Sequence, residues 1–150
     1  MGEYIPSPSK WVADQVELYE RSGGTCGATL GKNGPWKDLP VIIVTNRGKK
    51  TQSIRKTPLM KVMDGDKYIL VASQGGAPSN PSWYYNLQAE PLIEIQDGTH
   101  IQRMKVIEIS DPPEKKRLWR IAVETYPPYE DYQLRTDRCI PVFLASKFED

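Results

Sequence analysis

The chain has 150 residues, of which 39% are hydrophobic and 26% charged, which fits one globular domain and excludes disorder of the whole chain. Its 20 basic and 19 acidic residues give a net charge of +1, which does not support a nucleic-acid or membrane-surface partner. The two cysteines, Cys26 and Cys139, exclude a disulfide scaffold and a thiolate zinc site, and no apolar run approaches the roughly 18 residues of a membrane span.

The N-terminal region predicts one helix followed by a loop. Val12, Val16 and Tyr19 recur at helical spacing, which predicts an amphipathic helix over residues 9–22. The glycine-rich stretch 23–38 predicts a loop. We expect the helix to pack on the rest of the protein. Because it carries Trp11, peripheral contact with a membrane surface is the alternative.

The remainder of the chain predicts short strands joined by turns. Asp97-Gly98 is a hairpin signal, and Asp111 followed by two prolines and Glu114 predicts the start of a second long helix. A loop at 74–81 and a short helix at 82–89 interrupt the strands. Strands are expected at 39–46, 54–63, 67–73, 92–96, 99–109 and 139–145.

About six antiparallel strands with flanking helices predict an α+β fold built on a small β-barrel, because closing the sheet removes its exposed edges. The pattern contains no βαβ repeat, which argues against a doubly wound nucleotide fold. We expect a single domain over 1–150, with a helix and loop in 1–38 and the barrel core in 39–145.

Residues 39–63 form a cationic stretch that the near-zero net charge conceals. They include Arg47, Lys49, Lys50, Arg55 and Lys56 and no acid. Arginine offers a fork for phosphate or carboxylate and lysine a point charge, so the stretch fits a polyanion site. It also fits a solvated basic turn, and the residues alone leave both interpretations open.

Two further segments could form parts of a site. In Ser73-Gln-Gly-Gly-Ala-Pro78, two glycines after a strand can turn backbone N–H groups inward as an anion-binding nest, although an ordinary turn is the alternative. Tyr126, Tyr129 and Tyr132 recur every three residues, so their rings could line one face of a pocket. Three phenols are awkward to satisfy in a core, which favours the pocket.

Several kinds of chemistry find no support. His100 is the only histidine, which argues against a Ser-His-Asp or Cys-His site and against a histidine-rich metal centre. No pair of carboxylates stands out. We therefore expect no metal, and chemistry that belongs to an organic cofactor while the protein supplies binding and electrostatics.

Five motifs resemble the deazaflavin-dependent nitroreductase family, in the right order from about residue 39 to 145. The resemblance implies a split β-barrel like that of flavin reductases and pyridoxamine oxidases. It also implies coenzyme F420, an 8-hydroxy-5-deazaflavin with a ribityl phosphate and a glutamate tail. The motifs are GKKTxxxRxxPL (48–59), ASxGGA (72–77), NPxWYxNLxAxP (80–91), YPxYxxY (126–132) and TxRxIP (136–141).

The resemblance also implies roles for individual residues. The phosphate and tail carboxylates would meet Lys49, Lys50 and Arg55, and Thr51 would also bind the cofactor. The deazaflavin ring would be lined by Pro58, Leu59 and Met60. The length of the cofactor would be followed by Val71, Ala72 and Ser73, its phosphate would lie near Gln74, Gly75 and Gly76, and that wall would be completed by Trp83 and Asn86.

The implied activity is hydride transfer from reduced F420 to a quinone, nitroaromatic or enone acceptor. Tyr126, Tyr129 and Tyr132 would cover the acceptor and help to protonate it, and Ser73 would hydrogen-bond its developing negative oxygen. Gln74 stands where some relatives carry lysine and Met60 where some carry tyrosine, which leaves the choice of acceptor open.

Two alternatives accompany this interpretation. An FMN enzyme on the same barrel would use the ring site, although the cations exceed what one phosphate needs. A non-catalytic module could bind or carry the deazaflavin. We expect a small-molecule acceptor, no nucleic-acid partner and a monomer or homodimer. The N-terminus lacks a secretory signal pattern, so the expected location is the cytoplasm, with membrane association as the alternative.

Overall fold

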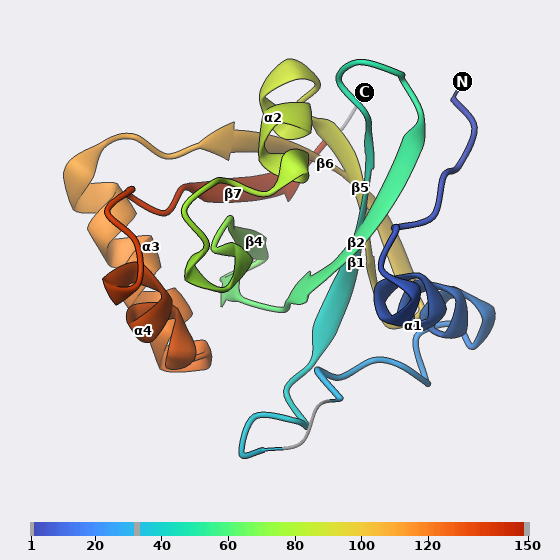
Figure 1. Ribbon diagram of the computed structural model, residues 1–150, viewed down its shortest axis with the longest axis horizontal. Coiled ribbons are helices and arrows are strands. Elements are labelled where there is room, and N and C mark those ends of the chain that lie inside the picture. Colours follow the sequence, from blue (N-terminus) through green and yellow to red (C-terminus); the bar gives the residue numbers. More distant parts are fainter. Residues whose placement is uncertain (1, 32–33, 149–150) are drawn as a thin grey trace.

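A computed structural model describes residues 2–31 and 34–148. Residues 32 and 33 of the expected loop, and residues 1, 149 and 150 of the expected domain, lie outside the described residues. The described chain forms one curled seven-stranded sheet with four α-helices around it (Figure 1). In Figure 1, α1 (Lys10–Arg21) lies at the right end of the molecule, α3 (Pro112–Thr125) and α4 (Pro128–Leu134) lie at the left end, and α2 (Ser82–Ala89) lies at the top.

The sheet has the order β2-β1-β5-β6-β7-β4-β3, and every pair of neighbours is antiparallel. The expected hairpin at Asp97-Gly98 is present, with Asp97 opposite His100. The strands are β1 (Val41–Arg47), β2 (Ile54–Met60), β3 (Met63–Asp64), β4 (Lys67–Val71), β5 (Leu92–Asp97), β6 (His100–Glu108) and β7 (Val142–Lys147).

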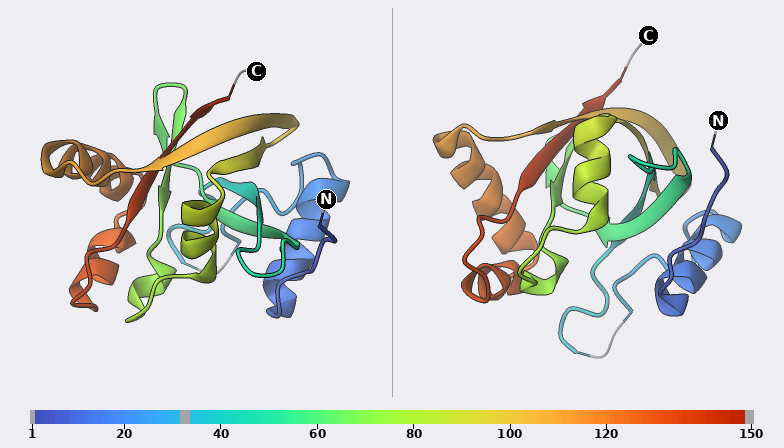
Figure 2. Two further views of the ribbon diagram at one scale, coloured as in Figure 1. Left: turned by 90° about the horizontal axis from the view of Figure 1, so that it is seen from above. Right: turned by 45° about the horizontal axis from the view of Figure 1, so that its top comes forward.

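The sheet curls because β2 and β3, which are consecutive in the chain, lie at its two ends (Figure 2). The N–H of Lys61 donates to the carbonyl of Pro40 beside β1, and the carbonyl of Val62 accepts from Ile69 of β4. The single strand expected at 54–63 is therefore wrong at residues 61 and 62, where the chain crosses between the ends. Apolar residues continue through this crossing, so the sequence pattern does not reveal it.

Alternating side chains place a separate apolar cluster on each face of the sheet. Ile42 and Val44 of β1 face a cluster with Leu70, Met104 and Phe143, closed by Trp83 and Leu87 of α2 (Ser82–Ala89). Val41 and Ile43 face the other cluster, which α1, α3 and α4 cover.

Helix α1 (Lys10–Arg21) packs on the barrel, as expected, through buried Val16 and Tyr19. The Tyr19 hydroxyl accepts a hydrogen bond from the N–H of Gly98 at 2.7 Å and lies 3.2 Å from the carbonyl oxygen of Gln96. This residue therefore fastens the helix to the β5–β6 turn.

Helix α3 (Pro112–Thr125) begins at Asp111, whose side chain accepts from the N–H of Glu114 as the sequence predicts. Helix α4 (Pro128–Leu134) was not among the helices expected from the sequence. Prolines fit the first turn of a helix because they lack only an N–H that has no partner there, so Pro127 and Pro128 do not prevent it. No helix in the described part is long and apolar enough to cross a bilayer.

Candidate active site

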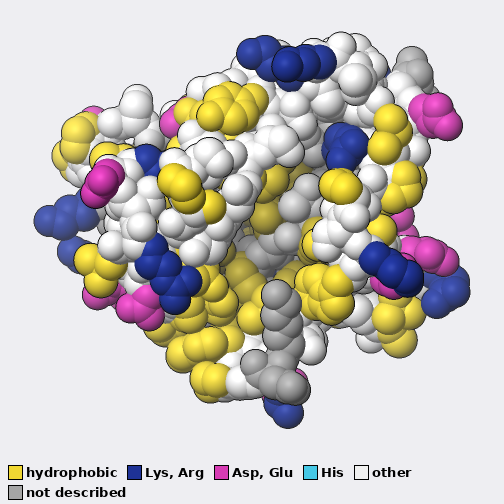
Figure 3. Space-filling model, viewed as in Figure 1, with side chains coloured by type: hydrophobic (Ala, Val, Ile, Leu, Met, Phe, Trp, Pro, Cys, Tyr) yellow, Lys and Arg dark blue, Asp and Glu magenta, His cyan; other side chains and the backbone are white. Residues whose placement is uncertain are grey.

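A cavity of about 510 Å³ opens between α1, β2, β4, α2 and α4, a size typical of small-molecule sites. Figure 3 shows this face hollowed at its centre, with hydrophobic side chains in the hollow and Lys and Arg side chains around it. Most of the residues predicted for the site line the cavity: Arg55, Pro58, Leu59, Met60, Val71, Ser73, Gln74, Gly75, Trp83, Asn86, Tyr126, Tyr129 and Tyr132.

Five predicted residues do not line the cavity. Lys49, Lys50 and Thr51 form the β1–β2 turn, where the N–H of Lys49 donates to the Asn86 side chain at 2.8 Å. This bond holds the basic turn against α2 beside the cavity. Ala72 is fully buried in the cluster under α2. Gly76 is buried against α4 and supports the cavity wall from behind.

The cationic stretch divides into paired and unpaired side chains. Lys56 forms an ion pair with Glu20 of α1, and its ammonium lies 5.1 Å from the ring centre of Tyr4. Arg55, which lines the cavity, and Lys50 in the turn form no ion pair within the described part of the chain. Positive charge is therefore left for an anionic ligand.

The segment after β4 has the backbone angles of a nest. Ser73 is right-handed with φ −77° and ψ −39°, and Gln74 is left-handed with φ 45°. A right-handed residue followed by a left-handed one turns successive N–H groups to one side. Among the described residues, the N–H groups of Ser73, Gln74 and Gly75 donate to no protein acceptor. The residues carrying them line the cavity.

The three tyrosines of α4 and the segment before it are not equivalent. The hydroxyls of Tyr126 and Tyr132 hydrogen-bond to each other at 3.1 Å. Tyr129 is 5% exposed and lines the cavity, and its hydroxyl forms no hydrogen bond within residues 2–31 and 34–148. Burial raises the pKa of Tyr129 well above its ordinary value of 10.0, so its hydroxyl keeps its proton. It can therefore donate to a bound ligand.

One wall of the cavity was not predicted from the sequence. Ser7, Pro8, Trp11, Val12 and Gln15 bring the N-terminal segment opposite the tyrosines. The amide of Gln15 donates to the carbonyls of residues 27 and 29 at 3.0 and 2.9 Å, which fixes the start of the loop behind it. The helical spacing of Val12 predicts an inward face, but only the fold shows that this face borders a cavity.

The described residues contain no group of three or more His, Cys, Asp or Glu side chains arranged to hold a metal ion. The arrangement instead combines an apolar, ring-lined hollow with unpaired cations, free backbone donors and one unengaged phenol. This is the kind of site that a split-barrel oxidoreductase uses to hold a flat, anionic redox cofactor.

Comparison with known proteins agrees with this class. Residues 11–147 match the family of F420H2-dependent quinone reductases. An F420H2-dependent quinone reductase of Mycobacterium tuberculosis is 40% identical over 111 residues, which cover 72% of this chain and 74% of the relative. The chain belongs to the F420H2-dependent quinone reductase family.

Solved structures give the same result. A structure described as an F420-H2 dependent reductase (FDR-A) is 42% identical and has a TM-score of 0.67, covering 71% of this chain and 94% of that one. A structure described as a domain-swapped dimer is 40% identical with a TM-score of 0.70, covering 93% of this chain and 100% of that one. The expected α+β split-barrel fold is confirmed.

Family membership also confirms the predicted class of activity. The protein is an oxidoreductase with F420H2-dependent quinone reductase activity, and F420 rather than FMN is its hydride-carrying cofactor. Because the protein is an enzyme, the alternative of a non-catalytic carrier is excluded. The motif resemblance to deazaflavin-dependent reductases is likewise confirmed.

Proposed function

We propose that residues 1–150 act as one deazaflavin-binding domain in which this cavity holds the cofactor and a quinone together. The observation that carries this proposal is the unengaged hydroxyl of Tyr129, which faces the same cavity as the unpaired guanidinium of Arg55. One part of the cavity can therefore attract an anion while another donates a hydrogen bond.

The residues present fit F420. Pro58, Leu59 and Met60 at the end of β2 provide an apolar wall for the ring, with Val71 and Trp83 completing it. The phosphate and glutamate carboxylates require cations and N–H donors, which Arg55, the basic turn and the nest after β4 supply. When bound in its reduced form, F420 supplies the hydride.

The protein's own groups serve the acceptor. A quinone that receives a hydride becomes a hydroquinone anion and needs one proton to become neutral. In the proposal, Tyr129 donates a hydrogen bond to that oxygen, the Ser73 hydroxyl stabilises the negative charge as it develops, and a proton from solvent neutralises the product. Tyr126 and Tyr132 form a hydrogen-bonded pair that covers the acceptor. Nitroaromatics and enones need the same hydride and proton, so we include them as candidate acceptors.

A titration tests the binding part of this proposal. Oxidised F420 and FMN are titrated into the purified protein at the same salt concentration, and the fluorescence of each ligand is followed. We expect tight binding of F420 and weak binding of FMN, and preference for FMN would overturn the assignment.

A turnover assay tests the chemistry. Reduced F420 and a short-chain benzoquinone are mixed with the protein without NADPH, and the absorbance of oxidised F420 is followed. We expect catalysed oxidation of F420, and binding without turnover would contradict the proposed roles of Ser73 and Tyr129.

We further propose that the site is completed within one chain and that the protein works in the cytoplasm. In the structure, α1 packs on the barrel of its own chain and contributes Trp11 to the cavity, with 46% of that residue exposed. Peripheral membrane contact through this exposed ring remains the alternative, and co-sedimentation with anionic lipid vesicles measures it. Loss of sedimentation in Trp11→Ala would support membrane contact, and absence of sedimentation in the wild type would exclude it under those conditions.

A further inference from the structure

Arg138 lies outside the cavity, yet it forms the densest set of side-chain hydrogen bonds around the segment that follows β4. Its guanidinium donates to the carbonyls of Ala72, Ser73 and Ala77 at 3.3, 2.8 and 2.9 Å. It also donates to the side-chain oxygen of Asn80 at 2.5 Å. One half-buried side chain therefore contacts both ends of the nest segment.

The geometry of the peptide bond gives these contacts a consequence for the cavity. In a planar trans peptide the C=O and the following N–H point in opposite directions. The carbonyls of Ala72 and Ser73 belong to the peptides that carry the N–H groups of Ser73 and Gln74. When Arg138 holds those carbonyls on its side, the two N–H groups point to the other side, where Ser73 and Gln74 line the cavity.

Arg138 also contributes charge. It forms no ion pair with an acid in the described part of the chain, so its partners are neutral dipoles. Its positive charge is hydrogen-bonded but not neutralised. Hydrogen bonds in a chain polarise one another, so the guanidinium makes the N–H groups on the far side of the two peptides better donors.

Gln74 shows that the arrangement is held against a local preference. Its φ of 45° is left-handed, a conformation that is strained for a residue with a side chain. Gly75 and Gly76 follow with φ of 63° and 81°. Arg138 and the contact with α4 supply the interactions that hold this conformation.

We propose that Arg138 is a positioning residue that holds the N–H groups of Ser73 and Gln74 toward the cavity as a binding site for the phosphate of F420. This inference rests on the proposed function. It adds the atoms that receive the phosphate, which are backbone N–H groups rather than the Gln74 side chain, and the residue that orients them.

The test compares two ligands in two proteins. Wild type and Arg138→Gln are titrated with F420 and with the same deazaflavin carrying its ribityl chain but neither phosphate nor glutamate tail. We expect Arg138→Gln to weaken F420 binding about 10- to 100-fold, the range for lost hydrogen bonds to a charged group, while binding of the phosphate-free ligand changes less than about twofold. Arg138→Lys keeps the charge but not the forked set of donors, so its affinity for F420 should lie between those of wild type and Arg138→Gln.

Arg120→Gln is the matched control because it removes one exposed arginine from α3 and should leave both affinities unchanged. Equal weakening of both ligands in Arg138→Gln would show a general structural role, and unchanged F420 binding would show that the nest does not depend on Arg138. Either outcome overturns the inference. If wild type binds neither ligand, the proposed function itself fails, so the two failures are distinguishable.

A second variant keeps the proposal testable if Arg138→Gln does not fold. Gln74→Gly removes the side chain but keeps the N–H and suits the left-handed backbone. We expect its affinity for F420 to stay within about threefold of wild type, because the backbone N–H is the donor. A loss of tenfold or more would assign the phosphate to the Gln74 side chain and contradict the proposal.

Discussion

At the scale of single residues, the structure separates side chains that the sequence presents as equals. Tyr126, Tyr129 and Tyr132 share one spacing, and the sequence predicts that they line a pocket together. It does not predict that the hydroxyls of Tyr126 and Tyr132 hydrogen-bond to each other, while the hydroxyl of Tyr129 has no hydrogen-bond partner in the described part of the chain. That distinction depends on the rotation of each ring in the folded chain, which spacing does not determine.

Tyr129→Phe removes the hydroxyl and keeps the ring. We expect turnover of a quinone by reduced F420 to fall about 100-fold, in the range for a lost hydrogen bond to the developing negative oxygen, with F420 affinity within about twofold of wild type. Burial raises the pKa of Tyr129, so the group is protonated at every pH below its raised pKa. Wild-type turnover should therefore show no loss from this group between about pH 6 and pH 9.

Tyr85→Phe is the matched control, because Tyr85 is 44% exposed on α2 and does not line the cavity. It should leave both turnover and affinity unchanged. Weaker F420 binding in Tyr129→Phe with turnover of the bound enzyme intact would instead make Tyr129 part of the cofactor wall.

At the scale of elements, the contact between α4 and the turn at Gln74–Gly76 shapes the cavity. A Cβ on Gly76 would lie 2.6 Å from the carbonyl oxygen and 3.0 Å from the Cα of Tyr132, and its φ of +81° is left-handed. Sequence reasoning predicted the glycine pair as a nest or a turn, but it missed α4. The sequence analysis therefore did not reveal that α4 approaches the turn so closely that position 76 requires glycine.

Gly76→Ala should push the turn away from α4. We expect a loss of about 2 kcal/mol or more in the free energy of unfolding, together with weaker F420 binding, because the opposing atoms are backbone and cannot move aside. Gly75→Ala is the control. It has the same handedness, but nothing lies within 4 Å of its added Cβ, so we expect only the backbone cost of about 1 kcal/mol. Equal losses in urea unfolding would show that the α4 contact contributes nothing.

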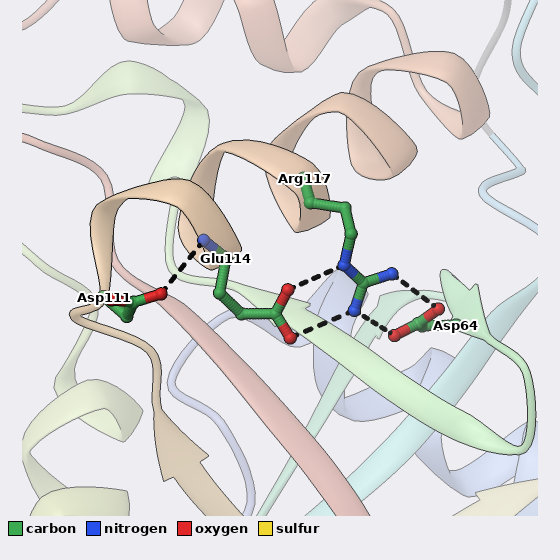
Figure 4. Close-up of polar contacts among 4 residues, drawn as sticks. All are labelled: Asp64, Asp111, Glu114 and Arg117. Carbon is green, nitrogen blue, oxygen red and sulfur yellow. Dashed lines mark hydrogen bonds and ion pairs between the residues drawn. The ribbon is translucent and has the colours of Figure 1, made fainter.

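Helix α3 is fixed to β3 by an ion-pair network that makes stability depend on pH. Arg117 bridges Glu114 on its own helix and Asp64 of β3, with a 2.8 Å contact to the Asp64 carboxylate (Figure 4). The hydrogen bond from Arg117 lowers the pKa of Asp64 below its ordinary value of 3.8. A lowered folded-state pKa stabilises the fold above the unfolded pKa, and this stabilisation is lost as pH falls through the folded value.

Asp64→Asn should therefore unfold at a lower urea concentration than wild type at pH 7, and the difference should shrink as the pH falls below about 4. Asp66→Asn, an exposed acid in the same turn without an ion pair in the described chain, should differ little from wild type at both pH values. A difference between Asp64→Asn and wild type that is constant with pH would mean that the carboxylate acts through packing rather than charge.

At the scale of the whole molecule, the site joins segments that are far apart in the chain. The motifs from residue 48 to residue 141 could be placed from the sequence, because each is a local pattern and their order is informative. The wall formed by the N-terminal arm (residues 2–31) could not, because α1 and β2 come together around the cavity only in the folded protein. The crossing at residues 61 and 62 was missed for the same reason, since pairing with β1 and β4 decides it.

Exchange of the arm between two copies can be tested by complementation. In the structure the arm lies on its own barrel, fastened by Tyr19, and a relative is described as a domain-swapped dimer. Val12→Asp places a charge in the arm's wall of the cavity, and Tyr129→Phe removes the phenol from the barrel, so we expect each variant alone to turn over poorly. If each chain completes its own site, the two variants refolded together should show only the mean of their separate activities. If two copies exchanged arms, half of the dimers would be mixed and each would contain one site with both residues intact, so activity would rise to roughly a quarter of wild type.

Light scattering coupled to size exclusion, on the same samples, would show whether a dimer forms without such exchange. A rise toward a quarter in a dimeric sample would contradict a site completed within one chain.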